Sequence, residues 1–180
     1  SEIAAADASV SVAMAVTNMV AEVICSYGSQ EQQQTFVPKL CSGEAVAGAF
    51  ALSEPQSGSD AASLRTVAEK IPGGYRLTGN KQWITSGDRA GVLVVWARTD
   101  GVEAASKKNA AAGLCAFLVP QGTPGLTAGR PEHKLGLRGS TTVPLILDGC
   151  EIPESALLGK VGDGFKIAMT ALDGGRIGIA

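Results

Sequence analysis

Residues 51–63 read Ala-Leu-Ser-Glu-Pro-Gln-Ser-Gly-Ser-Asp-Ala-Ala-Ser, directly after an apolar run that starts at Ala45. An apolar run that gives way to Ser, Gly, Pro and acidic residues is typical of a strand that delivers a loop to a ligand. Gly58 allows the backbone to come close to a bound group, because it has no Cβ. Further donors are the loop amides and the short hydroxyls of Ser53, Ser57 and Ser59. The segment therefore predicts a ligand-binding loop after a strand.

A second informative segment, residues 81–87, reads Lys-Gln-Trp-Ile-Thr-Ser-Gly. In a strand, Trp83 and Thr85 point to the same face because side chains alternate with a period of two. A large flat ring beside a hydroxyl suits a flat heteroaromatic ligand with polar edges. The alternative interpretation is a core Trp with a neighbouring strand Thr.

Hydrophobic periodicity places helices at both ends of the chain. Apolar residues at helical spacing predict a helix over Ala4–Tyr27 and another from Phe165 onward. Ser29 and Gln32 form a capping-box pattern that starts a short helix from Gln30 to Leu40, which Pro38 could shorten.

Between these helices, short apolar runs separated by turn signals predict an antiparallel β-domain. Pro72-Gly73-Gly74 predicts a three-residue hairpin turn, Asp148-Gly149 another turn, and Asp100–Gly113 an exposed excursion. The predicted strands are Ala45–Leu52, Thr66–Ile71, Tyr75–Thr78, Gln82–Thr85, Val92–Arg98, Leu114–Val119, Leu126–Arg130 and Val143–Leu147. The fold class is therefore α+β, with a β-domain between helical pieces.

Composition excludes several classes of protein. The 180 residues carry a net charge of −2 and only 4% aromatic residues, which argues against a nucleic-acid partner. The four cysteines lack CxxC spacing and only one histidine accompanies them, so we expect buried free thiols and no metal site. Asp7, Asn18 and Glu22 interrupt the apolar N-terminal stretch, so we expect it not to span a membrane.

Three other groups of residues could carry chemistry. Glu54 and Asp60 could be a paired acid and base, or they could hold loop amides or a neighbouring Arg. His133 stands in a charged segment without a hydrolase motif, so we expect no hydrolytic triad. Gly162-Asp163-Gly164 could cradle a phosphate at a helix start, or simply join a loop to a helix.

Several segments, in order along nearly the whole chain, resemble the acyl-CoA dehydrogenase family. Leu52-Ser-Glu-Pro-Gln-Ser-Gly-Ser-Asp60 is similar to the first signature of that family, and Trp83-Ile-Thr85 to its flavin-contacting strand. Lys134-Leu-Gly-Leu-Arg138-Gly-Ser-Thr and Leu158-Gly-Lys-Val-Gly-Asp-Gly-Phe-Lys-Ile-Ala-Met169 are similar to the exit from its β-domain.

The resemblance implies an architecture. Residues 1–45 would end the N-terminal helical domain, 46–158 would form a middle antiparallel β-barrel, and 159–180 would start the C-terminal helical domain. The pattern begins inside a helix and stops at Ala180 without a cap, so we interpret the chain as a fragment of a longer protein.

The resemblance also implies an activity. It is the FAD-dependent α,β-dehydrogenation of acyl-CoA thioesters to trans-2-enoyl-CoA in fatty acid β-oxidation, with electrons passed to an electron-transferring flavoprotein. The full-length protein would be a homotetramer, in the bacterial cytoplasm or the mitochondrial matrix. The segment Asp173-Gly-Gly-Arg176-Ile-Gly-Ile-Ala180 is most similar to short-chain, butyryl-type members. Alternatives are a flavin monooxygenase or oxidase on the same fold, or a non-catalytic scaffold.

Site residues follow from the resemblance position by position. Ser59 would also contact CoA, as would Asp173 and Arg176, which share one helix face and could alternatively form only a surface salt bridge. The residues implied to contact the cofactor are Phe50, Leu52, Ser53, Gly58, Ser59, Trp83, Ile84 and Thr85.

One departure from the family pattern concerns catalysis. Some members place the catalytic Glu just before the Arg of this helix, where this chain has Gly175, and in the others the Glu would lie beyond Ala180. We therefore expect no catalytic base within these residues, and a fragment that is inactive alone and binds FAD weakly or not at all.

Overall fold

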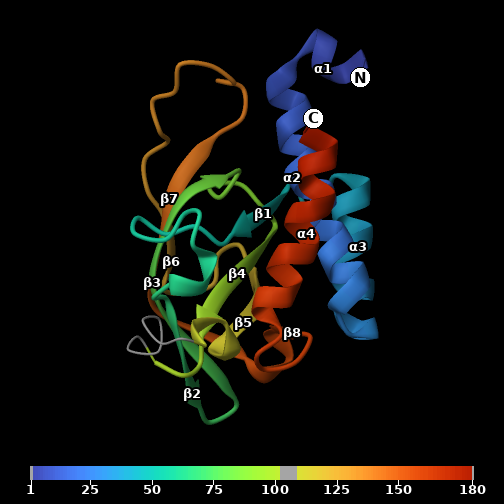
Figure 1. The fold of residues 1–180 in the computed structure, drawn as a ribbon. Coiled ribbons are helices and arrows are strands. Elements are labelled where there is room, and N and C mark those ends of the chain that lie inside the picture. The colour runs from blue at the N-terminus through green and yellow to red at the C-terminus, as the bar shows by residue number, and fades with distance from the viewer. Residues whose placement is uncertain (1, 102–108, 180) are drawn as a thin grey trace.

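The computed structural model describes residues 2–101 and 109–179, with side chains as far as Arg176. Figure 1 shows a curved sheet with a layer of helices against one side of it. Helices open and close the chain, and all strands lie between them. The α+β class predicted from the sequence is therefore confirmed. Half of the predicted excursion Asp100–Gly113, residues 102–108, lies outside the described residues.

The N-terminal helical stretch is two helices rather than one. The helices are α1 (Glu2–Ala6) and α2 (Ala8–Tyr27), and Asp7 separates them with an extended backbone. The Asp7 carboxylate accepts hydrogen bonds from the backbone amides of Ser9 at 2.7 Å and Val10 at 3.3 Å. An Asp side chain that caps the next turn competes with continuation of the helix, which explains the break.

Helix α3 (Gln30–Ser42) starts as predicted and ends later than predicted. The Ser29 side chain and the Gln32 side chain form both bonds of the capping box. Pro38 lies inside the helix, which ends instead at Gly43 with φ of +80°. A left-handed residue stops a helix more definitely than a proline near its end, and glycine adopts that conformation without strain.

Eight strands form one sheet in the order β6-β7-β3-β2-β4-β5-β8, with β1 beside β4. Short 3-10 turns η1 (Ala61–Ser63), η3 (Ala110–Gly113) and η4 (Glu154–Ala156) lie between strands, and α4 (Gly164–Ile179) closes the chain. The strands are β1 (Gly48–Ala51), β2 (Val67–Ile71), β3 (Gly74–Thr85), β4 (Val92–Arg98), β5 (Leu114–Pro120), β6 (Leu126–Ala128), β7 (Thr142–Pro153) and β8 (Leu157–Leu158).

The sheet is mixed, and the expected antiparallel β-barrel is not confirmed. Strand β1 runs parallel to β4, with Gly48 opposite Val92 and Ala51 opposite Val95. Strand β2 also meets β4 in parallel. Among the described residues, the two ends of the sheet, β6 and β8, do not pair with each other. The β2–β3 hairpin lies between β1 and β4 in the sequence, and after it β4 runs in the same direction as β1. The alternation of side chains along a strand gives no information on the direction in which the strand runs.

Three local predictions are also corrected. The predicted strands Tyr75–Thr78 and Gln82–Thr85 are both parts of β3. The hairpin turn has two residues, since Ile71 pairs with Gly74. Asp148-Gly149 is an irregularity inside β7 rather than a turn, because the register shifts there against β3.

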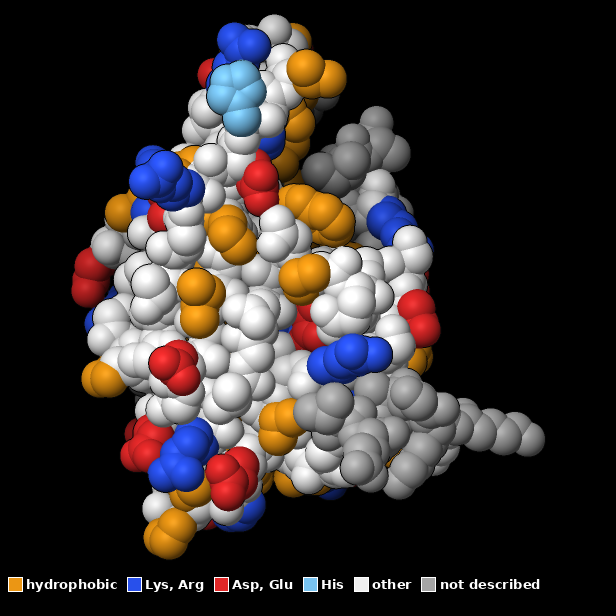
Figure 2. All heavy atoms as spheres, turned by 90° about the vertical axis from the view of Figure 1, so that its left-hand side faces the viewer, with side chains coloured by type: hydrophobic (Ala, Val, Ile, Leu, Met, Phe, Trp, Pro, Cys, Tyr) orange, Lys and Arg blue, Asp and Glu red, His pale blue; other side chains and the backbone are white. Residues whose placement is uncertain are grey.

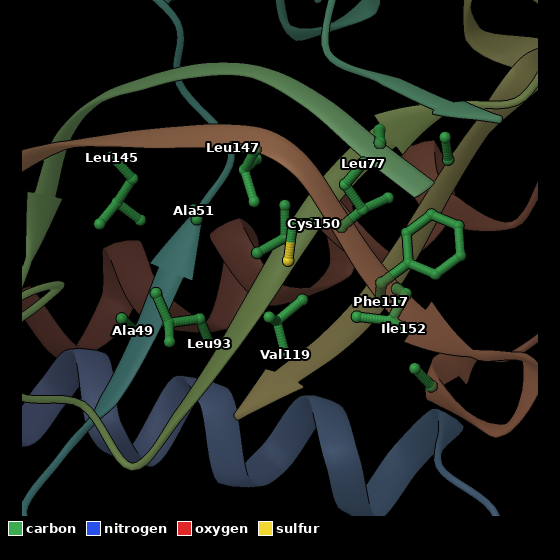
Figure 3. Packing of buried hydrophobic residues seen from close by; sticks show 14 of the residues in the cluster. Ala49, Ala51, Leu77, Leu93, Phe117, Val119, Leu145, Leu147, Cys150 and Ile152 are labelled. Carbon is green, nitrogen blue, oxygen red and sulfur yellow. The ribbon is translucent and has the colours of Figure 1, made fainter. Parts of the chain in front are cut away.

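Strand β4 separates two hydrophobic cores, and all seven of its residues are buried. Leu93, Val95 and Ala97 face the first core, which Figure 3 shows between strands of the curved sheet. The alternate residues Val92, Val94 and Trp96 face the second core, beneath α2 and α4. The Trp96 indole donates a hydrogen bond of 2.8 Å to the backbone carbonyl of Gly164, which fixes the start of α4 on the sheet.

Helix α2 is long and apolar enough to cross a membrane by length and composition alone. The core helix of a globular domain can have the same profile. In this structure, Met19, Val20, Val23 and Ile24 of α2 pack in the second core.

The cysteines divide into two classes. Cys115 and Cys150 are buried free thiols, as expected, whereas Cys25 and Cys41 are exposed on α2 and α3. Burial raises the pKa of the Cys150 thiol to about 11, so this thiol stays protonated near neutral pH.

Candidate functional site

The loop after Leu52 and the strand that carries Trp83 are in direct contact. The backbone amide of Gln82 donates a hydrogen bond of 2.9 Å to the carbonyl of Ser53. Two segments that the sequence analysis singled out separately therefore lie side by side. They come from β1 and β3, and we call the surface they form the β1–β3 wall (residues 50–53 and 82–85).

Trp83 reaches the wall through a β-bulge. Between Lys81 and Ile84 the register of β3 shifts by one residue against β7, and Trp83 adopts φ of +59°. The bulge turns the indole outward to 58% exposure, while Ile84 stays 2% exposed in the first core. The alternative interpretation, a core Trp, is therefore wrong. Thr85 is half-buried, which agrees with the predicted shared face of Trp83 and Thr85.

Not all predicted wall residues present their side chains. Leu52 and Ile84 are buried in the two cores, so any contact they make with a ligand would come from their backbone. Phe50 is half-buried, and its ring lies against Trp96 with centroids 4.3 Å apart.

Polar groups of the β1–β3 wall and of the loop that follows it are available to a ligand. Within the part of the chain that the structure describes, the hydroxyls of Ser53 and Thr85 on the wall and of Ser59 in the loop have no hydrogen-bond partner. A Cβ on Gly58 would meet no atom within 4 Å, so the space over this loop is open. An exposed ring on one surface with unpaired hydroxyls fits a flat ligand with polar edges.

A buried ion pair holds the loop against the strand. Lys81 is fully buried, and its ammonium lies 2.8 Å from Oε1 of Glu54, which is 2% exposed. Further bonds to the Glu54 carboxylate come from the amide of Arg65 at 2.6 Å, the amide of Thr66 at 3.0 Å and the Gln56 side chain at 2.6 Å. This favours the interpretation that Glu54 holds loop amides rather than acting as an acid or base.

Lys81, the partner of Glu54, was not identified from the sequence. The signal that could have indicated it is a lysine at a buried position of strand β3. Asp60, the other carboxylate of the proposed acid–base pair, is exposed.

Each charge of this pair shifts the pKa of the other group. Burial would raise the pKa of Glu54, but the Lys81 charge and hydrogen bonds from Lys81, Thr66 and Arg65 outweigh it and lower the pKa below the ordinary 4.5. Burial lowers the pKa of Lys81 from the ordinary 10.5 to about 8, although Glu54 partly opposes this. Near neutral pH the pair is therefore ionised.

A second buried cation holds the far end of the same loop. The guanidinium of Arg98 on β4 donates to the carbonyls of Leu64 at 2.9 Å and Ala62 at 3.1 Å. It also bonds the carbonyl of Ala110 at 2.9 Å and the carboxylate of Asp100 at 3.0 Å. The sequence analysis did not single out Arg98.

Asp173 and Arg176 lie elsewhere, on α4, and both are exposed. Among the described residues no ion pair joins them, so the surface salt bridge that was the alternative for this pair is absent. Gly174 and Gly175 between them border a cavity of about 260 Å³ between α2 and α4. Its lining residues are Ile3, Ser11, Met14, Ala15, Asn18, Met19, Glu22, Gly174 and Gly175.

The two remaining candidates have structural explanations. The Gly162 amide donates to Cys115 Sγ at 3.4 Å, and Gly164 packs on the Cys115 backbone. These contacts favour a joint between loop and helix over a phosphate cradle. His133 is exposed in the β6–β7 loop. On the face shown in Figure 2, positive and negative side chains of the described residues are interspersed.

Comparison with known proteins gives two family-model matches. The acyl-CoA dehydrogenase N-terminal domain matches residues 1–44, and the acyl-CoA dehydrogenase middle domain matches residues 49–150. Together they cover most of the chain.

Individual relatives agree with these matches. The chain is 48% identical to the human mitochondrial short-chain specific acyl-CoA dehydrogenase over 99% of its own length and 42% of that protein. The structure of butyryl-CoA dehydrogenase from Megasphaera elsdenii matches with a TM-score of 0.88 at 38% identity, over 96% of this chain and 44% of that one. A glutaryl-CoA dehydrogenase from Mycobacterium smegmatis in complex with FADH2 matches with a TM-score of 0.80 at 38% identity, over 91% and 39%. The chain thus spans less than half the length of these relatives.

Proposed function

Because this chain belongs to the acyl-CoA dehydrogenase family, we propose that it binds FAD on the β1–β3 wall and takes part in α,β-dehydrogenation of acyl-CoA thioesters. The observation that carries the proposal is the contact between the Ser53 loop and the bulge that exposes Trp83. A relative of similar fold is described in complex with FADH2, which supports the choice of cofactor.

The residues of the wall would hold the cofactor in complementary ways. The Trp83 indole would cover one face of the isoalloxazine, and the hydroxyls of Ser53 and Thr85 would bond its polar edge. When bound, FAD would supply the acceptor for the hydride that leaves Cβ of the thioester. Phe50 would close one side, and the open space at Gly58 would let the loop backbone approach the cofactor.

Proton abstraction needs a base that these residues do not offer at the family position. The residue before Arg176 is Gly175, and the buried carboxylate of Glu54 is occupied by Lys81 and loop amides. We therefore propose that the Glu that removes the α-proton lies outside residues 1–180, and that these residues alone are inactive.

The substrate would be a short acyl-CoA. Its CoA portion would meet Ser59, Asp173 and Arg176, and its acyl chain would enter the cavity between α2 and α4. The product would be a trans-2-enoyl-CoA, and a human relative named as short-chain specific supports this class.

The domain and partner assignments belong to the same proposal. Residues 1–45, 46–158 and 159–180 would be the end of an N-terminal helical domain, the middle domain and the start of a C-terminal helical domain. Family-model matches at 1–44 and 49–150 support the first two. Electrons would pass to an electron-transferring flavoprotein, and the assembly would be a homotetramer. The compartment would be the mitochondrial matrix, which the human relative supports, or a bacterial cytoplasm.

The test is reconstitution of the full-length protein with FAD. We expect a flavin absorbance band in the full-length protein and bleaching of that band by butyryl-CoA, whereas residues 1–180 alone should bind FAD weakly or not at all and should not turn over short acyl-CoAs with a dye acceptor. Absence of flavin from the full-length protein would overturn the proposal, and turnover by residues 1–180 alone would overturn the assignment of the base outside them. Rapid reoxidation of the reduced flavin by oxygen would point instead to an oxidase.

A further inference from the structure

Three consecutive residues of the loop are tied to two consecutive residues of strand β3. The Lys81 ammonium donates to the carbonyl of Leu52 at 3.2 Å and to the carboxylate of Glu54 at 2.8 Å. The Gln82 amide donates to the carbonyl of Ser53 between them at 2.9 Å. The loop therefore cannot slide along the strand without breaking several bonds at once.

The Glu54 carboxylate extends this connection to the other end of the loop. It accepts from the amides of Arg65 and Thr66 and from the Thr66 hydroxyl at 2.5 Å. Residues 52 and 66 are thus both held at one buried point. The loop between them contains Gly58 and Ser59.

The bulge at Trp83 transmits this constraint to the exposed face. In a regular strand, Lys81 and Trp83 would share a face because they are two residues apart. The register shift after Lys81 instead leaves Lys81 fully buried and turns Trp83 out to 58% exposure. An ammonium fixed on the inner side therefore sets the position of an indole on the outer side.

We propose that Glu54 and Lys81 are positioning residues for the flavin, because their ion pair fixes Ser53 and Trp83 relative to each other across the β1–β3 wall. This inference rests on the proposed function. A merely stabilising role would be filled equally well by apolar residues, since a buried ion pair often contributes no more stability than a hydrophobic pair of similar volume. An ion pair adds directional bonds, which fix a register that apolar contacts would leave loose.

The experiment compares the Lys81→Met/Glu54→Gln double variant with the wild type, both as the full-length protein. The matched control is Lys70→Met/Glu154→Gln, which removes a Lys–Glu pair of similar length, 2.7 Å, from the exposed surface. FAD affinity is measured by quenching of flavin fluorescence, and the visible flavin spectrum records the environment of the ring. Thermal unfolding in the absence of FAD measures the fold separately.

We expect the double variant to unfold cooperatively near the wild-type temperature, yet to bind FAD at least about tenfold more weakly with a shifted visible spectrum. The control should bind as the wild type does. Glu54→Asp, which keeps both charges, provides a second variant should the double variant fail to fold, and we expect the same spectral shift from it.

The outcomes separate the inference from the proposed function. Wild-type affinity and an unchanged spectrum in a folded double variant, or in Glu54→Asp, would overturn the positioning role and leave the proposed function intact. If the wild type itself fails to bind FAD, both are overturned.

Discussion

At the scale of single residues, Trp83 combines an exposed indole with a backbone conformation that bulky side chains rarely adopt. Its φ is +59°, a backbone conformation that glycine adopts without strain and other residues do not. In an ordinary strand position, Ala is more stable than Gly by about 0.5–1 kcal/mol. At Trp83 we expect the reverse order, because Ala retains the backbone strain, which amounts to roughly 1–3 kcal/mol.

The prediction is that Trp83→Gly has a free energy of unfolding about 1 kcal/mol above that of Trp83→Ala. Urea denaturation of both variants measures this difference. The control is Thr85, in the regular part of the strand, where the Ala variant should be more stable than the Gly variant. Both Trp83 variants should bind FAD more weakly than the wild type. An order at Trp83 that matches the order at Thr85 would show that the bulge stores no strain.

The Glu54–Lys81 pair predicts a pH profile. The lowered pKa of Glu54 gives stability that is complete above the ordinary value of 4.5 and is lost as the pH falls through the folded-state value. Lys81 changes the stability of the fold at alkaline pH. Between its folded pKa of about 8 and its ordinary value of 10.5, the unfolded chain holds more protons than the folded one, so stability rises with pH.

Urea denaturation from acid to alkaline pH checks both effects. Relative to Lys81→Met/Glu54→Gln, the wild type should lose stability below pH 4.5 and gain it from about pH 8 to 10.5. Removal of Glu54 alone should destabilise the protein near neutral pH by about 3–5 kcal/mol, because a buried ammonium is left without its counter-charge. A difference between wild type and double variant that does not vary with pH would contradict the assignment of these titrations.

At the scale of elements, the start of α4 depends on close approach to β5. A Cβ on Gly164 would lie 2.6–2.7 Å from backbone atoms of Cys115, which cannot move aside as a flexible side chain can. Gly164→Ala should therefore lower the free energy of unfolding by about 1–3 kcal/mol. Gly136, whose Cβ would meet nothing within 4 Å, is the control. An equal effect of alanine at both positions would mean that α4 does not need this contact.

Elements differ in how far the sequence determines them. The capping box at Ser29 and the strand Val92–Arg98 follow from local pattern, and both were predicted. The parallel pairing of β1 with β4 was not, because strand direction depends on the path of the intervening hairpin. The break at Asp7 could have been predicted from its capping pattern. The register shift after Lys81 could not, because a one-residue bulge produces no recognisable periodicity in the sequence.

At the scale of the whole molecule, the β1–β3 wall brings together two segments that the sequence analysis singled out separately. Ser53 follows an apolar strand and Trp83 lies in an alternating one, and the family resemblance connected both to one cofactor. The cations that hold the segments together could not be predicted, since Lys81 and Arg98 have partners far away in sequence. Buried charges are satisfied by tertiary contacts, which local pattern does not record.

Arg98 joins β4 to the loop at Ala62 and Leu64 and to η3 at Ala110. Arg98→Met would leave these buried carbonyls without donors, and we expect a loss of about 3 kcal/mol or more in the free energy of unfolding. Hydrogen exchange should show loss of protection in the 62–66 segment and in η3 together, because both lose the same donor. Arg76→Met removes an arginine whose ion pairs with Glu69 and Glu151 are exposed, and it should change stability by no more than about 0.5 kcal/mol. If exchange increases in only one of the two segments, Arg98 does not couple them.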